Sequence, residues 1–325
     1  MRLAIGIIAY NNSSSPYLPF FLPSLKEAMD NSSFSSFRLF VCDNSDLENT
    51  ENKELVDDFL SKNQNFPLNY IAVKNNLGFS AAYNLMISEA ASDGADYFLV
   101  INPDTLIDSG AIEKMKTVLE SDSTLASVAP KILSWDFKNK KLGEKIDSLG
   151  IAMLPGLKFI DLGQGEEASS YSLKDSSILG PSGAGGLFKM KALLAVAEER
   201  SGKIQYFDER FFMYKEDCDL AYRLFLSGYA SQTVPSAVIY HDRTASSMGQ
   251  GFRKILLNRA FKSRQVRTWS FLNQHLLYGK FWSKQNFLAR IIILRRVFSY
   301  LLFSLIFERF LLKQYPILLK LLKRK

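Results

Sequence analysis

The first 110 residues alternate short apolar runs with amphipathic segments, a pattern typical of strands separated by helices. Apolar runs at residues 3–9, 37–42, 68–73 and 97–101 predict four strands, and apolar spacing predicts helices over residues 19–30 and 80–91. Short buried strands joined by helices are typical of a parallel sheet with helices on both faces. The sequence therefore predicts an α/β fold whose ligand site lies beyond the carboxyl ends of the strands.

Polar clusters follow each predicted strand. They are Tyr10-Asn11, Asp43-Asn44-Ser45, residues 75–79 and residues 102–104. Any one cluster suits an ordinary turn, but four at the same sheet edge favour a binding site. No GxGxxG follows the first strand and no GxxxxGK[ST] occurs, so the sequence supports neither a classical dinucleotide site nor a P-loop.

Composition narrows the class of protein. The chain has 325 residues, of which 47% are hydrophobic and 22% charged, so it can bury a full core and is neither fibrous nor mostly disordered. Cys42 and Cys218 are the only cysteines, which excludes a disulfide framework or a cysteine-based zinc site and favours a reducing compartment. The first ten residues contain no small-residue cleavage site and predict a buried strand rather than a signal peptide.

The charge is distributed unevenly. Residues 251–325 carry 17 Lys or Arg and a single acidic residue, Glu308, for a formal charge of +16, whereas residues 1–250 carry −9. This asymmetry indicates an anionic partner for the tail, either a membrane surface or nucleic acid. The longest uncharged stretch, residues 297–307, has 11 residues, against about 20 for a spanning helix. We therefore expect basic amphipathic helices lying on an anionic membrane. The high apolar content of the tail disfavours nucleic acid as its partner. Two other roles for the tail stay open, a helical cap packed on the body of the protein and a contact between subunits of an oligomer.

Seven motifs occur in order along residues 1–245. They are IIAYN at residues 7–11, CDNSD at 42–46, NNLGFSAAYN at 75–84, INPD at 101–104, GPSGAGGLF at 180–188, FDERFFMYKEDCDLAYR at 207–223 and IYHD at 239–242. This set resembles glycosyltransferase family 2, with the GT-A fold, and within it the rhamnosyltransferase-like branch. The resemblance implies a GT-A catalytic domain over residues 1–250, built on a mixed sheet with helices on both faces. Residues 251–325 would then form a basic amphipathic helical membrane-association region.

The resemblance also implies roles for individual residues. Asp104 and His241 would bind a divalent cation, Mn²⁺ or Mg²⁺, although Asn102 replaces the first carboxylate of the DxD-like motif. Asp104 could instead cap a helix after Pro103, and His241 could be a structural histidine. Residues implied to bind the donor are Tyr10, Asn11, Asp43, Asn44, Asn76, Gly78, Asn84, Asn102 and Asp104, and those implied to form a sugar or acceptor loop are Ser182, Gly183, Gly185 and Gly186.

Glu216 and Asp217 are the candidate catalytic pair. Residues 220–226 have helical spacing, which places the pair at a helix N-terminus, where the macrodipole stabilises carboxylates. Direct displacement at an anomeric carbon needs one base for the acceptor hydroxyl, and the resemblance assigns that role to Asp217. The alternative is that both acids only stabilise the first helical turn. His275, in the tail, has no predicted catalytic role.

Residues 135–175 show little periodicity and predict an acceptor-side insertion or loop. The implied reaction is inverting transfer of one sugar, with dTDP-rhamnose as the expected donor, to a hydroxyl of a lipid-linked or growing cell-surface polysaccharide. We expect the protein to be peripheral, on the cytoplasmic face of the cell membrane. Its expected partners are the sugar donor, the glycan acceptor and the anionic membrane surface, and nucleic acid is not expected. Whether it forms a homodimer stays open.

Two other functions compete with this one. A nucleotidyltransferase would need a phosphate-binding loop with Lys or Arg after the first strand, which residues 11–15 lack. A non-catalytic scaffold is supported only by the missing DxD carboxylate and is opposed by the intact Glu216-Asp217 pair.

Overall fold

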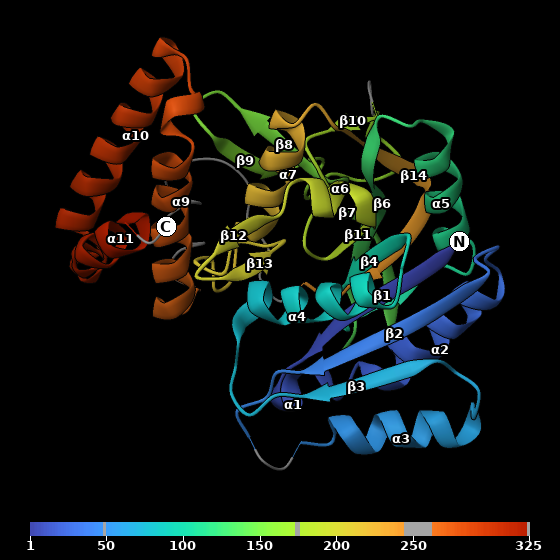
Figure 1. Ribbon diagram of the computed structural model, residues 1–325. Helices are drawn as coiled ribbons and strands as arrows, with labels where there is room; N and C mark the ends of the chain where they lie inside the picture. Colours follow the sequence, from blue (N-terminus) through green and yellow to red (C-terminus); the bar gives the residue numbers. More distant parts are fainter. Residues whose placement is uncertain (48–49, 173–175, 244–261, 324–325) are drawn as a thin grey trace.

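A computed structural model of the chain describes residues 1–47, 50–172, 176–243 and 262–323 (Figure 1). Its first half confirms the four predicted strands. They are β1 (Arg2–Ala9), β2 (Ser36–Asp43), β3 (Leu68–Ala72) and β4 (Tyr97–Ile101), all parallel, in the order β4-β1-β2-β3. The connecting helices are α1 (Asn11–Ser14), α2 (Leu18–Asp30), α3 (Asn52–Lys62) and α4 (Gly78–Ser92), so both predicted helices are also confirmed.

Helices cover both faces of this sheet because its strands are apolar on both sides. Leu3, Ile5 and Ile7 of β1 pack in one core cluster with residues of α2 and α5 (Ala111–Ser121). The alternate residues Ala4 and Ile8 pack in a second cluster with α4. The period of two along a strand therefore supplies both layers of the core.

The second half of the sheet contains antiparallel pairs. β11 (Gly185–Lys189) pairs antiparallel with β4, and the sheet continues through β6 (Leu125–Asp136), β14 (Ala230–His241) and β10 (Ser177–Ile178). The short β5 (Thr105–Ile107) pairs with the end of β14, and β7 (Lys141–Ser148) pairs with β6. Helix α6 (Met190–Ala195) follows β11, and α7 (Glu216–Leu226) precedes β14. The sheet is thus mixed.

Of the two alternatives for residues 135–175, an acceptor-side insertion or a loop, the loop is wrong for much of the region, and the insertion stays a prediction. This region contains β7 and a hairpin of β8 (Ile151–Leu154) and β9 (Lys158–Asp161). A second hairpin, β12 (Glu198–Arg200) and β13 (Lys203–Gln205), precedes α7. The sequence of β7 is KLGEKIDS, in which four of the eight residues are charged, so it shows no clear apolar alternation.

The tail is helical, as expected. It contains α9 (Arg264–Lys280), η1 (Trp282–Lys284), α10 (Phe287–Ile306), η2 (Arg309–Lys313) and α11 (Gln314–Lys323), which gather at one side of the molecule beside α7 (Figure 1). Within the described ranges, none of the helices is both long and apolar enough to cross a membrane. The predicted boundary at residues 250–251 lies outside the described residues.

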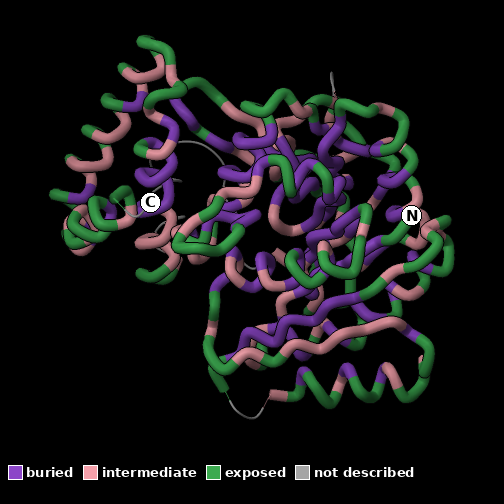
Figure 2. The backbone as a smooth tube through the Cα atoms, viewed as in Figure 1, coloured by how far each residue is buried: buried purple, intermediate pink, exposed green. Residues whose placement is uncertain are grey.

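The helix α9 is part of the folded body. Leu276 and Leu277, both fully buried, share a core cluster with Ile151 of β8, Phe211 and Tyr222 of α7. By contrast, α10 has only two buried residues, Ile293 and Ser304 (Figure 2). The packing-cap alternative therefore describes α9, whereas most of α10 faces outward.

Because α9 shares a core with α7, we expect residues 1–243 and the tail to unfold together. Leu276→Ala should lower the free energy of unfolding by about 2–5 kcal/mol, since it opens a cavity in a closed cluster. Leu319→Ala, at a position that is 60% exposed on α11, is the matched control and should change it by less than about 0.5 kcal/mol. Urea unfolding followed by far-UV circular dichroism and by tryptophan fluorescence measures this. Two separate transitions in the Leu276→Ala variant would contradict a shared core.

Candidate active site

The carboxyl ends of β1 and β2 carry a dense hydrogen-bond network. The carboxylate of Asp43, the last residue of β2, accepts hydrogen bonds from the hydroxyls of Ser45 and Tyr70 and from the amide of Asn52, the last at 3.3 Å. Burial and this carboxylate raise the pKa of Tyr70, so its phenol stays a donor. Asp43 is therefore held in one orientation at the sheet edge.

The loop after β1 is bound to the loop after β2. Asn11 has a left-handed backbone, with φ of 45°, and its Oδ1 accepts hydrogen bonds from the backbone of Asp46 at 3.0 Å and Leu47 at 3.2 Å. Tyr10 donates its hydroxyl to Asp46 at 2.9 Å. The structure thus brings Tyr10 and Asn11 next to the Asp43 cluster, as predicted.

A third loop closes the same edge. The Nδ2 of Asn44 donates to Asn76 at 2.9 Å, and its Oδ1 accepts from the backbone of Leu77 at 2.7 Å. Gly78 has φ of +77°, and a Cβ there would lie 2.4 Å from the carbonyl oxygen of Phe212. Glycine is therefore required, because the loop must pass directly against the segment before α7.

Asn84 is the predicted donor residue that lies apart from this edge. It is buried in α4, where its Oδ1 accepts from the backbone of Tyr206 and Phe207 and its Nδ2 donates to Phe207 and Glu209. All of its polar atoms are occupied in holding residues 206–209.

Asp104 lies at the end of β4, beside the end of β14. The strand β5 follows it, and the next helix, α5, begins at Ala111 after the N-cap Gly110, so the helix-cap alternative is wrong. The buried Oδ1 of Asp104 has no hydrogen-bond partner within the residues that the structure describes. It lies 3.3 Å from Nε2 of His241. The neighbouring Asn102 donates its backbone N–H to Ala184 at 3.2 Å, which joins this corner to the glycine-rich segment.

His241 is held between two carboxylates. Its Nδ1 lies 2.8 Å from Asp147, opposite the Nε2 that faces Asp104. Burial opposes protonation of the imidazole, but the two carboxylates outweigh it and raise the pKa of His241 to about 9. A cation on the Asp104 side would have to displace the proton from Nε2, which would leave the remaining proton on Nδ1, toward Asp147.

Three residues of this network were not predicted. Arg243 bonds Asp147 at 2.9 Å and Asp161 at 3.1 Å. Burial would raise the pKa of Asp147, but His241 and Arg243 outweigh it and lower that pKa. The proximity of Arg243 to His241 in the sequence was an available signal, whereas Asp147 and Asp161 lie on β7 and β9, inside the region that looked irregular.

The Glu216-Asp217 pair begins α7, as predicted. The two residues before it, Tyr214 and Lys215, both have left-handed backbones, with φ of 72° and 73°. Asp217 is half-buried, and its carboxylate accepts from the backbone N–H groups of Gly183 at 3.0 Å and Cys218 at 2.7 Å. Backbone donors of this kind fix a carboxylate at a helix N-terminus.

Glu216 differs from its neighbour. It is 5% exposed, and its Oε2 has no hydrogen-bond partner in the described part of the chain. Burial, and secondly the charge of Asp217, raise the pKa of Glu216 well above its ordinary value. Asp217 is therefore the member of the pair suited to accept a proton.

The glycine-rich segment divides into two parts. Ser182 and Gly183 line a small cavity with Asp217, and the buried Oγ of Ser182 has no partner within the described ranges. Gly185 and Gly186 instead form the start of β11, paired with Ile101 and Val100. These two residues therefore belong to a strand and not to a loop, whereas their predicted role toward the sugar or acceptor stays a prediction. Glycine is needed at position 186 because of close packing, since a Cβ there would lie 2.3 Å from the side chain of Pro181.

Comparison with known proteins places this site in a family. The model for glycosyl transferase family 2 matches residues 4–190. A relative from Mycobacterium tuberculosis, named N-acetylglucosaminyl-diphospho-decaprenol L-rhamnosyltransferase, is 26% identical over 257 residues, covering 76% of this chain and 78% of its own. The same protein from a second strain matches equally.

The fold is also that of a solved structure. GalNAc-T7, solved with UDP, GalNAc and Mn²⁺, matches with a TM-score of 0.54 and 13% identity over 88% of this chain, which spans 52% of that longer protein. This likeness, at the level of the fold alone, agrees with the predicted mixed-sheet GT-A architecture. The family match covers more than half of the chain, and it decides against both the nucleotidyltransferase and the scaffold. With its sheet-edge loops, its acidic pair and its Asp104–His241 corner in place, the chain belongs to glycosyl transferase family 2 and is a GT-A glycosyltransferase.

Proposed function

We propose that the protein transfers a single sugar, with inversion, from a nucleotide-diphosphate donor to a hydroxyl of a lipid-linked or growing glycan. The observation that carries this proposal is Asp217, an accessible carboxylate fixed by two backbone donors beside the glycine-rich segment. The name of the mycobacterial relative supports rhamnose as the sugar and a lipid-linked acceptor, and dTDP-rhamnose is the donor that we propose.

In this proposal Asp217 removes the proton of the acceptor hydroxyl as its oxygen attacks the anomeric carbon. One base is sufficient, because direct displacement forms one bond as the other breaks. The donor lies at the edge formed by Asp43, Asn44 and Asn76, whose side chains are already ordered by their mutual hydrogen bonds.

Asp104 and His241 are the residues that would hold a divalent cation, Mn²⁺ or Mg²⁺. The Oδ1 of Asp104, which makes no hydrogen bond within the described residues, and the Nε2 of His241 that faces it at 3.3 Å fit such a group as one hard and one borderline ligand once Nε2 has lost its proton. When bound, the cation would neutralise the negative charge of the leaving diphosphate. The residues that the structure describes contain no cluster of three or more such ligands, so donor phosphate oxygens and water would complete the coordination.

The outer face of α10 supports attachment to a membrane surface. Phe287, Leu294, Phe298 and Ile306 are 56–75% exposed and, with Ile291, Leu302 and Leu305, follow helical spacing along one side. An exposed apolar stripe of this length beside basic residues is typical of a helix lying in the membrane interface. We propose that the protein is peripheral on the cytoplasmic face of the cell membrane, where its acceptor would lie.

The first test concerns the base. Asp217→Asn should lower kcat by about 100-fold or more and leave the KM for the donor within about threefold, because the isostere keeps shape but cannot accept the proton. Glu216→Gln should cost less than about tenfold, because Glu216 is enclosed by the protein and the amide keeps its shape. Steady-state nucleotide release with acceptor measures both. A kcat above a tenth of wild type in Asp217→Asn would move the role elsewhere.

The second test concerns the cation. Mn²⁺ with nucleoside diphosphate should raise the Tm of the wild-type protein, and Asp104→Ala should abolish this increase, because it removes the carboxylate ligand. His241→Ala should weaken it, and the double variant should resemble Asp104→Ala, since both residues would act on one ion. An unchanged Tm increase in Asp104→Ala, with activity that survives EDTA, would show that no cation is bound there.

The third test concerns the membrane. Co-sedimentation with anionic vesicles should fall at least fivefold in Leu294→Glu/Phe298→Glu and should weaken with salt in wild type, because screening shortens the reach of the basic side chains. Leu194→Glu, a 51% exposed leucine on α6, is the matched control. Arg290 and Arg296 are unsuitable targets because they donate to the carbonyls of Trp282 and Gly156. Absence of vesicle binding, together with a dimer that Leu294→Glu/Phe298→Glu dissociates, would assign the stripe to a homodimer.

A further inference from the structure

We infer that the tail helix α9 positions the catalytic base, with Asn273 as the positioning residue that holds the backbone immediately before Asp217. The inference rests on the proposed role of Asp217. It adds a residue from the tail, outside the segment matched by the family, to the machinery of the reaction.

Asn273 lies at the middle of α9 and is 1% exposed. Its Nδ2 donates both of its hydrogens, to the carbonyl of Met213 at 2.8 Å and to that of Tyr214 at 2.7 Å. The carbonyls of two consecutive residues are thus bound by one buried side chain. A side chain with a single donor, or none, could not do this.

The backbone that Asn273 holds is strained. Tyr214 and Lys215 are consecutive non-glycine residues in the left-handed region, with φ of 72° and 73°. Residues of this type adopt that conformation only where the surroundings impose it. The N-cap Lys215 supplies no side-chain hydrogen bond of its own to α7. The two bonds from Asn273 therefore stabilise the turn that sets where α7 begins.

The direction of that turn decides where Asp217 points. Glu216 and Asp217 follow Lys215 directly, and Asp217 bonds the N–H of Gly183 at 3.0 Å. If Tyr214 and Lys215 relaxed to ordinary dihedrals, the first turn of α7 would rotate and this bond would lengthen. Proton transfer requires placement to a fraction of an ångström, so the rate should fall before the fold is lost.

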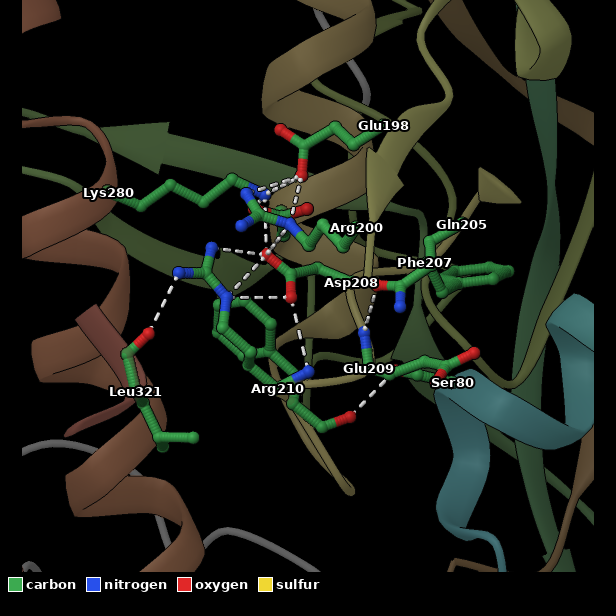
Figure 3. A network of polar contacts seen from close by, with 12 residues as sticks. Ser80, Glu198, Arg200, Gln205, Phe207, Asp208, Glu209, Arg210, Lys280 and Leu321 are labelled. Atoms are coloured by element: carbon green, nitrogen blue, oxygen red, sulfur yellow. Dashed lines mark hydrogen bonds and ion pairs between the residues drawn. The ribbon is translucent and has the colours of Figure 1, made fainter. Parts of the chain in front are cut away.

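The far end of α9 holds the other side of Asp217. Lys280 Nζ lies 2.7 Å from Asp219, two residues beyond the base. It also lies 2.8 Å from Asp208 and 2.9 Å from Glu198, and Figure 3 shows these two contacts. The same helix therefore contacts the chain on both sides of Asp217, at Tyr214 and at Asp219. This arrangement explains why α9 is buried against the body while α10 is not.

The experiment compares two neighbouring amides of α9. Asn273→Ala removes both bonds to the loop, and Asn273→Ser, a milder change, keeps one donor. Gln274→Ala is the matched control, because Gln274 is also buried but donates its amide to Leu157, on the β8–β9 hairpin, at 3.0 Å. For each protein we would measure kcat, the KM for the donor, the Tm, and hydrogen exchange of the peptide spanning residues 211–218.

We expect Asn273→Ala to lower kcat by at least about tenfold and to leave the KM for the donor within about twofold of wild type. The kcat of Asn273→Ser should lie between those of Asn273→Ala and wild type. Gln274→Ala should keep kcat within about twofold. Exchange in residues 211–218 should accelerate only in the Asn273 variants. Equal kcat losses in Asn273→Ala and Gln274→Ala, in proportion to their Tm, would overturn the inference, as would unchanged exchange. If wild type transferred no sugar, the proposed function would fail, and the exchange measurement would still decide whether Asn273 holds the loop.

Discussion

The buried ammonium group of Lys280 joins parts of the enzyme that are far apart in the sequence. Its three carboxylate partners belong to α7, to the strand β12 and to the segment between β13 and α7. Asp208 is fully buried and also pairs with Arg210, whose guanidinium reaches the carbonyl of Leu321 in α11. Removing one member of such a group leaves buried charges without compensation, at a cost of about 3–5 kcal/mol. The position of the catalytic helix therefore depends on the tail being in place.

The active site obeys a similar constraint on charge. Asp104, Asp147, Asp161 and the Glu216-Asp217 pair gather where the fold would receive a diphosphate, which is itself an anion. Arg243 lies between Asp147 and Asp161, and His241 lies between Asp147 and Asp104. Burial raises the pKa of Glu216 well above its ordinary value, which disfavours its charged form. Of these acids, Asp217 has no cationic side chain paired with it among the described residues, and it is the one that we propose acts on the acceptor. This distribution of charge favours a site with one catalytic base and one cation-binding position, rather than a site in which any of the acidic residues could act.

The sequence predicted those parts of the structure that depend on residues close together in the chain. Buried parallel strands are continuous apolar runs, so β1 to β4 could be located, and their polar carboxyl ends converge because parallel strands end at one edge. Asp147 and Asp161 could not be found, because their strands are weakly patterned and meet Arg243 only through long-range pairing. Gly186 was mistaken for a loop residue because its contact with Pro181 is visible only after folding. Asn273 gave no signal, because it stands among the polar residues Gln274 and His275, and nothing in the sequence separates the one that reaches the segment before α7.

The arrangement of the tail also bears on how a lipid-linked acceptor could reach the base. Such an acceptor is confined to the membrane interface, so its hydroxyl approaches from a direction that the protein must match. The helices α9 and α10 are joined only by residues 281–286, within which Gln285 bonds the hydroxyl of Tyr222 on α7 at 2.8 Å. A short connection pinned to the catalytic helix leaves little freedom between the outward stripe of α10 and Asp217. If the stripe lies on the membrane, the height and tilt of the base above the lipid surface are set by the same contacts that hold α7. Membrane attachment and catalysis would then depend on the same rigid part of the structure. The basic tail would both bind the membrane and fix the distance between the lipid surface and the base that acts on the acceptor.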